Sequence, residues 1–465
     1  MINKKNAIVF FSTGIFLLLT WYLGFQIDRT QFFYLITHYG FFFLLYLVVY
    51  HYSSDHKTIL WYTGVGVGLR FLLIFAFPNL SDDVYRFIWD GRLIANGINP
   101  FDHLPTYYIE EGVNISGIST ALYEQLNSPN YFTIYPPVNQ FIFATAAYLF
   151  PNSIIGSSIV MKSYLFLMEV GSLYLIFQLL RHFQLPEKNI LLYALNPLII
   201  FEIMGNIHFE GAMIFFLLLS VWLIAIKQQL VGSAIAMALA IASKLLPLIF
   251  LPFFILRLSN KLVEQPSKSR IIAWFQRIDW LKNLLFFGVL GISLLLLFLP
   301  LFSGSFLANF GASLNLYFQK FEFNGSISYL LRWLGYKYKG YNIIQYLGPS
   351  LSILAFLIIL YLMFREQTPR WNNLFKQLLF AICAYLFLSM TVHPWYVALP
   401  IVCCLFTLFR FPILWSGLIF LTYINYNYVA YQENLWMVAI EYILIGIFVG
   451  YEFFFNDELE MMNDE

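Results

Sequence analysis

The chain has 465 residues, of which 60% are hydrophobic and only 11% are charged, and its formal net charge is +1. A soluble domain carries about 25% charged residues, so this composition excludes a water-facing surface over the whole chain. One oversized soluble core is also excluded, because single cores stop growing at about 250–300 residues. The composition therefore predicts an all-α polytopic membrane protein, for which we expect no nucleic-acid partner.

Apolar runs that approach the length of a spanning helix, about 20 residues, recur along the chain. They are 7–25, 32–50, 58–79, 157–180, 189–204, 210–226, 230–243, 245–257, 283–302, 342–364, 374–392, 395–409, 411–425 and 435–455. Several runs are shorter than a bilayer, and pairs of short runs meet at polar residues, which suggests helices that end around a cavity. We expect one integral membrane domain over 1–465, a bundle of roughly 13–14 transmembrane helices.

Basic residues orient these runs, since cytoplasmic loops are enriched in Lys and Arg. Lys4 and Lys5 place the N-terminus in the cytoplasm, and counting forward makes 258–282 a basic cytoplasmic loop and leaves the C-terminus inside. The outer segment 303–341 departs from this pattern. Its cations and aromatic residues suggest an interfacial helix; they include Lys320, Arg332, Lys337, Lys339, Tyr329, Trp333 and Tyr336.

The stretch 80–137 falls outside as a large first extracytoplasmic loop. Pro136 and Pro137 then open a short apolar run, 138–150. If this run crossed the membrane, every later loop would lie on the opposite side. The basic loops would then no longer be cytoplasmic. We therefore interpret this run as a re-entrant or interfacial helix.

Unusual polar groups gather at the predicted outer ends of spans, where ionisable residues are expensive and often functional. Five such positions occur: 82–83, 205–210, 243–244, 323–325 and 393–396. Structural polar residues would be expected on both sides of the membrane. The one-sided pattern predicts one shared outer cavity.

The first of these positions is an acidic pair, Asp82 and Asp83. In one interpretation Ser81 caps a helix and the acids suit its positive N-terminal end. In the other, Asp82, Arg86 and Asp90 share a helical face at four-residue spacing. That face suits a carboxylate that accepts a proton beside an arginine that binds an anion. Arg86 could instead only neutralise the two aspartates.

The remaining polar positions also have two interpretations each. Lys244 either snorkels to the interface or binds a phosphate as a compact charge. His208 and Glu210 form either a hydrogen-bonded turn or metal ligands; without a close spacing such as His-Glu-x-x-His, the turn is favoured. His393 can donate to a phosphate or sugar oxygen, whereas Trp395 is also expected at a membrane interface.

Several of these motifs together resemble one known family. The run 81–101 (SDDVYRFIWDGRLIANGINPF), Tyr135-Pro136-Pro137, 205–211, 243–247 and 393–396 are similar to bacterial membrane mannosyltransferases of the GT-C superfamily. These are relatives of the catalytic subunit of the GPI mannosyltransferase. The resemblance extends over nearly the whole chain, and 81–101 is its most specific part. The large outer loop follows the third predicted span here, whereas in many members it follows the first.

The resemblance implies a GT-C-like fold and a hexosyltransferase that uses a polyprenyl-phosphate sugar, with mannose favoured over another hexose. An acidic residue of the first large outer loop acts as general base, with inversion at the anomeric carbon; it maps onto Asp82 or Asp83. The acceptor is a lipid-linked or cell-envelope glycan. No cofactor is implied, and a divalent metal is possible but not required.

The candidate residues divide by role. Binding of the donor phosphate is assigned to Lys244, Arg86, Arg92 and His393. Binding of the acceptor or sugar is assigned to His208, Glu210, Trp395, Tyr396 and Asn324. The expected location is a bacterial inner membrane with the active site outside. The alternative function is a multi-pass transporter, flippase or polymerase of lipid-linked saccharides; transport would favour charges near mid-bilayer and internal repeats.

Overall fold

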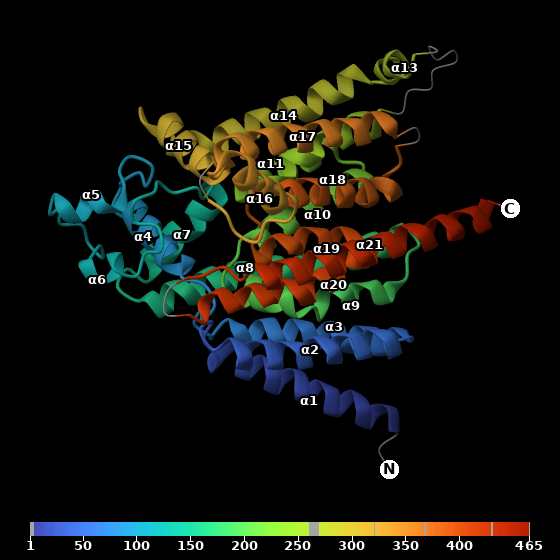
Figure 1. The fold of residues 1–465 in the computed structure, drawn as a ribbon, viewed down its shortest axis with the longest axis horizontal. Helices are drawn as coiled ribbons and strands as arrows, with labels where there is room; N and C mark the ends of the chain where they lie inside the picture. The colour runs from blue at the N-terminus through green and yellow to red at the C-terminus, as the bar shows by residue number, and fades with distance from the viewer. Residues whose placement is uncertain (1–3, 260–268, 320, 367–368, 429–430, 465) are drawn as a thin grey trace. The chain divides into compact units, whose positions relative to one another are not determined.

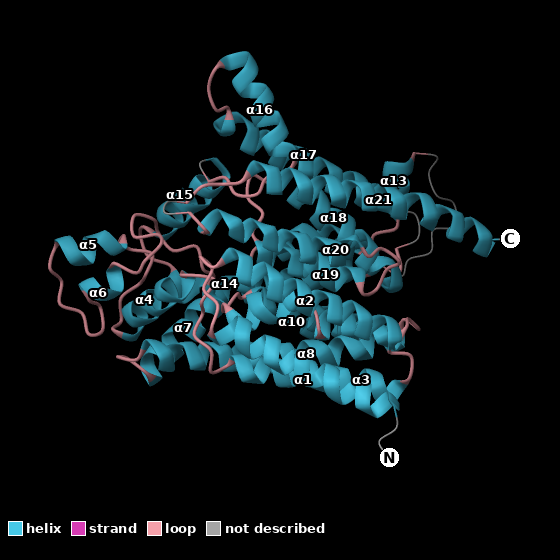
Figure 2. Cartoon of the chain, turned by 60° about the horizontal axis from the view of Figure 1, so that its bottom comes forward, coloured by secondary structure: helices cyan, strands magenta, loops and turns pink. Residues whose placement is uncertain are grey.

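The computed structural model describes residues 4–259, 269–319, 321–366, 369–428 and 431–464. Over these ranges the chain forms helices joined by loops, and the only β-type pairing is an isolated bridge between Phe323 and Thr391 (Figure 2). The predicted all-α class is confirmed.

Six helices of the described residues are long and apolar enough to cross a membrane, or up to seven if a pair bent by 52° counts as one span. The six are Asn6–Phe25, Phe32–Tyr52, Ile154–His182, Trp280–Leu301, Ile344–Arg365 and Leu435–Phe455. Each coincides with a predicted apolar run, so the polytopic membrane class is confirmed. The other predicted runs also fold as helices, but shorter ones, and the number of crossings beyond these six or seven stays a prediction.

The chain divides into two compact units. Unit 1 comprises Met1–Leu69, Leu180–Glu202 and Gln319–Glu465, and unit 2 comprises Arg70–Leu179 and Ile203–Phe318. Four helices cross the boundaries between these segments: α3 (His56–Leu73), α8 (Ile154–His182), the π-helix η2 (Ile199–Gly205) and, by its last residue, α15 (Phe306–Gln319).

Unit 2 contains the large loop and its supporting helices. Besides most of α8, its helices are α4 (Asp83–Ala95), α5 (Pro105–Glu110), α6 (Thr120–Tyr123), α7 (Pro137–Leu149), α10 (Glu210–Ala225), α11 (Leu230–Ser243), η3 (Leu246–Phe253), α12 (Phe254–Arg257), α13 (Arg270–Gln276), α14 (Trp280–Phe298), η4 (Leu299–Leu301) and α15 (Phe306–Gln319). α10 packs on α11, and α11 packs on both α14 and α7. Figure 1 shows α4 to α7 grouped at one end of this unit.

The predicted loop 80–137 contains α4, α5 and α6. Within it, α4 packs against α7, the helix that follows the loop. Gly91 of α4 permits this approach: a Cβ there would lie 2.3 Å from the carbonyl oxygen of Phe143. α7 begins at Pro137, where a missing N–H costs nothing because first-turn N–H groups lack helical partners. With 13 residues, α7 is too short to span a bilayer, as the re-entrant or interfacial interpretation requires.

Unit 1 contains the N-terminal helices and the C-terminal bundle. Besides most of α3, its helices are α1 (Lys4–Phe25), α2 (Phe32–Tyr52), η1 (Glu187–Ile190), α9 (Leu191–Ala194), α16 (Ile327–Lys339), α17 (Ile344–Arg365), η5 (Trp371–Asn373), α18 (Leu374–Leu388), η6 (Pro394–Val397), α19 (Ala398–Cys404), α20 (Phe411–Leu418), η7 (Ile419–Tyr426) and α21 (Leu435–Asp464). α17 packs on α18, α19 on α20, and α20 on α21.

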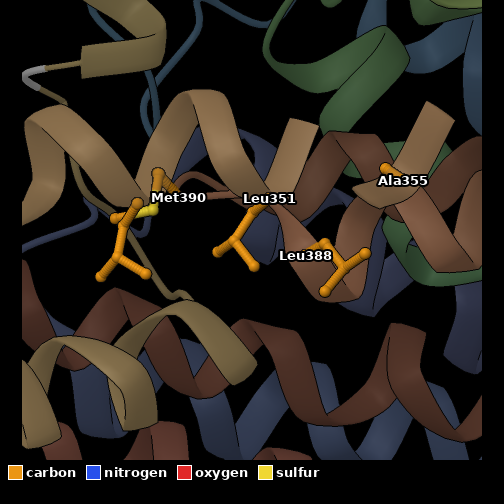
Figure 3. Packing of buried hydrophobic residues seen from close by; sticks show 5 residues of the cluster. Leu351, Ala355, Leu388 and Met390 are labelled. Carbon is orange, nitrogen blue, oxygen red and sulfur yellow. The ribbon is translucent and has the colours of Figure 1, made fainter. Parts of the chain in front are cut away.

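A small apolar cluster holds the end of α18 in unit 1. Leu351 and Ala355 of α17 belong to the same buried cluster as Leu388 and Met390, which lie at the end of α18 and just beyond it (Figure 3). This packing fixes the loop that leads to His393.

Two predicted loops contain helices. The segment 258–282 includes α13 and the start of α14, and 303–341 includes α15 and the interfacial candidate α16. Lys261, Lys268 and Lys320 lie outside the described residues. On α16, Leu330, Trp333 and Tyr338 are exposed, as a helix lying in the interface requires. The sidedness inferred from the basic residues stays a prediction.

Candidate functional site

The acidic pair lies where the chain re-enters a helix after α3. α4 begins at Asp83, and Asp82 immediately precedes its first turn. The hydroxyl of Ser81 accepts a hydrogen bond from the backbone N–H of Asp83 at 3.3 Å. Oδ1 of Asp83 accepts a hydrogen bond from the side-chain amide of Asn127 at 2.7 Å. Both aspartates are half-buried, so the turn formed by Ser81 leaves their carboxylates partly accessible.

Arg86 is buried and committed to structural contacts. Its Nε donates to Oδ1 of Asp90 at 2.9 Å, and its Nη1 donates to the carbonyls of Ser128 and Tyr131 at 3.0 and 2.9 Å. These bonds join α4 to the end of the outer loop. These contacts favour a role in which Arg86 neutralises Asp90, and not the acidic pair.

Arg92 is also buried, and its Nη1 donates to the carbonyl of Gly117 at 2.6 Å. Burial lowers the pKa of this guanidinium from its ordinary value. Binding a donor phosphate would require Arg92 to give up its present hydrogen bond. The two arginines therefore fasten the loop in this structure, and their phosphate-binding roles stay predictions.

Lys244 has a different environment. Its backbone is extended after the end of α11, and its Nζ lies 2.6 Å from Oε1 of Glu210. The lysine side chain is 24% exposed, whereas that of Glu210 is 1% exposed. The preceding carbonyl, of Ser243, accepts a hydrogen bond from Asn139 of α7 at 3.0 Å. The cation thus lies at the accessible edge of a buried ion pair.

The turn before α10 holds Glu210 in place through an unusual backbone conformation. Ile207, which is fully buried, has a φ of 62°. A β-branched residue rarely adopts this left-handed conformation, and such strain often accompanies a functional site. The same turn places the side-chain oxygen of Asn206 3.3 Å from the backbone N–H of Leu80, just before the acidic pair. His208 is buried in this turn.

The phenol of Tyr135 interacts electrostatically with several of these groups. Burial raises the pKa of its phenol well above the ordinary value, and Asp83 raises it further, whereas Arg86 lowers it and Asp90 and Glu210 raise it. The phenol therefore lies within electrostatic reach of both ends of the site. Unit 2 brings Asp83 into the same electrostatic neighbourhood as the ion-paired Glu210.

Unit 1 contains the remaining candidates. The ring of His393 contacts those of Phe323 and Trp395, with centroids 4.6 and 4.5 Å away. The loop of Phe323 is fastened to this segment by backbone hydrogen bonds to Met390 and from Val392, at 3.1 and 2.8 Å. The ring of Tyr396 lies 5.4 Å from His393. These residues form an aromatic group on two paired loops.

Asn324, the last candidate, is fully buried and has a φ of 50°. Its N–H donates to Glu433 at 2.7 Å, and its side-chain amide donates to both oxygens of Glu441 at 3.2 Å. Trp415 also donates to Glu441, at 2.8 Å. Asn324 therefore anchors the loop of Phe323 from within.

The structure thus gathers the acidic pair, Lys244 and Glu210 in unit 2, and gathers His393, Trp395, Tyr396 and Asn324 in unit 1. Convergence of the two sets on one cavity stays a prediction. In the described part of the chain, no group of three or more His, Cys, Asp or Glu side chains is arranged to hold a metal ion.

Sequence reasoning missed three residues of the unit 2 site. Tyr135 entered the sequence analysis only within the motif Tyr135-Pro136-Pro137, with no chemical role assigned to it. Asn139 and Gln140 were not considered, although both are polar and open a short apolar helix, which is the signal that marked the other candidates. Gln140 donates to Oδ2 of Asp90 at 3.1 Å. Oδ1 of Asn139 and Oε1 of Gln140 are buried and have no hydrogen-bond partner among the described residues.

These features define an all-α polytopic membrane protein with an acidic pair and a buried lysine–glutamate pair in one unit. Residues 48–260 match the family model described as "Alpha-(1->6)-mannopyranosyltransferase, N-terminal domain". The matched range includes Asp82, Asp83, Glu210 and Lys244. The resemblance to bacterial membrane mannosyltransferases is confirmed by this match.

One curated relative is Alpha-(1->6)-mannopyranosyltransferase A of Corynebacterium glutamicum. The chain is 24% identical to it over 189 residues, which are 39% of this chain and 36% of the relative. The chain thus spans about a third (36%) of the length of that relative.

Proposed function

We propose that this protein is a membrane mannosyltransferase that moves a mannosyl unit from a polyprenyl-phosphate donor to a lipid-linked or cell-envelope glycan acceptor. Transfer occurs at the non-cytoplasmic face of the membrane with inversion at the anomeric carbon. One observation carries the proposal: within the segment that matches the mannosyltransferase family, Asp83 and the Lys244–Glu210 pair lie in one unit, with Tyr135 in electrostatic reach of Asp83 and Glu210.

Asp83 is the proposed general base. Its carboxylate takes the proton of the acceptor hydroxyl as the acceptor oxygen bonds to the anomeric carbon. The bond between that carbon and the donor phosphate oxygen breaks, and its electron pair leaves with the lipid phosphate. Asp83 is favoured over Asp82 because the hydrogen bond from Asn127 to its Oδ1, at 2.7 Å, orients this carboxylate.

Lys244 is the proposed cation for the leaving phosphate. Negative charge grows on the phosphate as the glycosyl bond breaks, and a positive group placed there lowers the barrier. The ammonium is the accessible member of its ion pair, so it can approach a phosphate while Glu210 holds it in place. Oε2 of Glu210, buried and without a hydrogen-bond partner among the described residues, is an acceptor for a sugar hydroxyl.

The test is a transfer assay in membranes with polyprenyl-phosphate mannose, comparing wild type, Asp82→Asn and Asp83→Asn. We expect Asp83→Asn to lower kcat by about 10³-fold, a typical loss for a general base together with its positioning, and Asp82→Asn to lower it less. Asp102→Asn is the matched control, since this carboxylate of the same outer loop accepts a hydrogen bond from Ser305, which an amide oxygen can also accept. Normal transfer by both acidic-pair variants would falsify the proposal.

A further inference from the structure

A lysine inside a membrane helix of unit 2 supports the segment that carries the acidic pair. Lys162 lies in α8 and is fully buried. Its Nζ donates hydrogen bonds to the carbonyl of Leu73 at 3.0 Å and to the carbonyl of Ala76. Leu73 is the last residue of α3.

Burial of an ammonium is unfavourable unless it gains hydrogen bonds or an opposite charge. The last carbonyls of a helix supply both, because they lack helical partners and form the negative end of the helix dipole. Lys162 therefore serves as a C-terminal cap that reaches α3 from another helix.

The segment that follows α3 forms no regular helix before α4 begins. From Ile74 to the start of α4 at Asp83 the chain forms only turns and bends, and Pro78 cannot donate a backbone hydrogen bond. Hydrogen bonds from two other elements reach this stretch: Lys162 donates to the carbonyl of Ala76, and the side-chain oxygen of Asn206 accepts from the N–H of Leu80.

Asn206 belongs to the turn in which Ile207 has the left-handed backbone. Such strain persists only where the surrounding structure fixes it. The turn that aligns Glu210 for Lys244 therefore also supports the backbone two residues before Asp82.

We propose that Lys162 and Asn206 are positioning residues that fix the acidic pair from α8 and from the turn before α10. The proposal rests on the proposed function, because it concerns the geometry of the base. A misplacement of about 1 Å can cost about 10²-fold in rate. Each support therefore affects kcat more than the binding of the donor.

The first experiment is hydrogen–deuterium exchange on the full-length protein in lipid nanodiscs, comparing wild type, Lys162→Met and Asn206→Ala. Peptides covering 73–83 are expected to exchange at least about tenfold faster in both variants, while peptides of α10 and α14 stay unchanged. Ser163→Ala is the matched control on the same helix, since Ser163 bonds only to the carbonyl of Ile159 within α8. Unchanged exchange in 73–83 for both variants overturns the proposal, as does faster exchange throughout.

The second experiment is the transfer assay on the same proteins, normalised to folded protein. We expect kcat to fall by about tenfold to 10²-fold in Lys162→Met and Asn206→Ala, with KM for the donor within about twofold. A rise in KM at constant kcat contradicts positioning of the base. If the exchange result holds and wild type transfers no mannose, the proposed function fails while the structural support stands.

Discussion

The two units treat buried carboxylates in different ways. In unit 2 they are matched by cations: Glu169 pairs with Arg70, Asp90 with Arg86, and Glu210 with Lys244, at 2.9, 2.9 and 2.6 Å. In unit 1, the half-buried Glu433 and the buried Glu441 accept hydrogen bonds from the hydroxyl of Tyr329 and the indole of Trp415, whereas Glu322 pairs with Arg332 at 2.8 Å.

The difference separates carboxylates that pair with a cation from carboxylates that fix the backbone around them. In an ion pair with an accessible cation, the cation can approach a substrate anion while the carboxylate holds it in place. A carboxylate bound by neutral donors fixes the backbone around it, as Glu433 and Glu441 do for Asn324. We therefore expect removal of a charged partner to be costly at the ion pairs of unit 2, and replacement of the carboxyl group to be well tolerated at Glu433 and Glu441 of unit 1.

Among the changes that test this comparison, the largest expected effect is that of Lys244→Met. This change removes the proposed phosphate cation and leaves Glu210 buried without its partner. Breaking a fully buried pair costs about 3–5 kcal/mol, and we expect less here because Lys244 is 24% exposed. We expect kcat/KM for the donor to fall by at least about 10²-fold. Steady-state transfer and thermal unfolding of the purified variant measure the two effects.

The double variant Lys244→Met/Glu210→Gln separates the two roles of the lysine. Neutralising Glu210 is expected to restore the unfolding midpoint to near that of wild type. Activity is expected to stay low, because the phosphate still lacks its cation. Recovery of activity in the double variant would show that Lys244 only neutralises Glu210. The proposal that Lys244 binds the donor phosphate would then be wrong.

How far the sequence predicted the site depends on the kind of interaction. Every apolar run folded largely as helix, because the length and hydrophobicity of a run are local information. Their position at predicted span ends singled out Asp83, Glu210 and Lys244, which lie in unit 2, but it singled out Asn324 and His393 of unit 1 in the same way. The roles of Arg86 and Arg92 were harder to predict, because their partners are backbone carbonyls that any residue can supply.

Tyr135 and Lys162 make contacts that no sequence pattern predicts. Tyr135 lies beside two prolines, and this context does not indicate a role for its phenol. Lys162 sits in an apolar run that also contains Glu169, and its partners on α3 lie 89 and 86 residues away in sequence. Contacts of this kind depend on tertiary packing, which no local spacing reveals.

The second prediction concerns unit 1 and its membrane helix α21. Glu441→Gln replaces a buried carboxyl group with an amide, whose oxygen can still accept a hydrogen bond from Trp415. The side-chain oxygen of Asn324 is buried and has no hydrogen-bond partner in the described ranges, so a flip of this amide supplies an acceptor for the new Nε2. We expect transfer activity within about threefold of wild type and an unchanged or higher unfolding midpoint. A loss as large as that of Lys244→Met would erase the contrast between the units.

The smallest expected effect is a pH dependence at Glu433, outside the spanning helices. Burial raises the pKa of this carboxyl, although hydrogen bonds from Tyr329 and Asn324 lower it. The folded protein thus binds this proton more tightly than the unfolded chain. The resulting stability is complete below the ordinary glutamate pKa of about 4.3 and is lost as pH rises through the raised value.

Glu433→Gln removes this titration while its amide oxygen still accepts from Tyr329. We expect the unfolding midpoint of wild type to fall with rising pH relative to that of the variant, starting near pH 4 and by no more than a few degrees in total, because one group contributes about 1.4 kcal/mol for each unit of pKa change. Differential scanning fluorimetry of both proteins across pH 4 to 8 measures the difference. Parallel curves would mean that the hydrogen bonds to Glu433 fully offset the effect of burial on its pKa. This site of unit 1 would then hold an ionised carboxylate at no cost in stability.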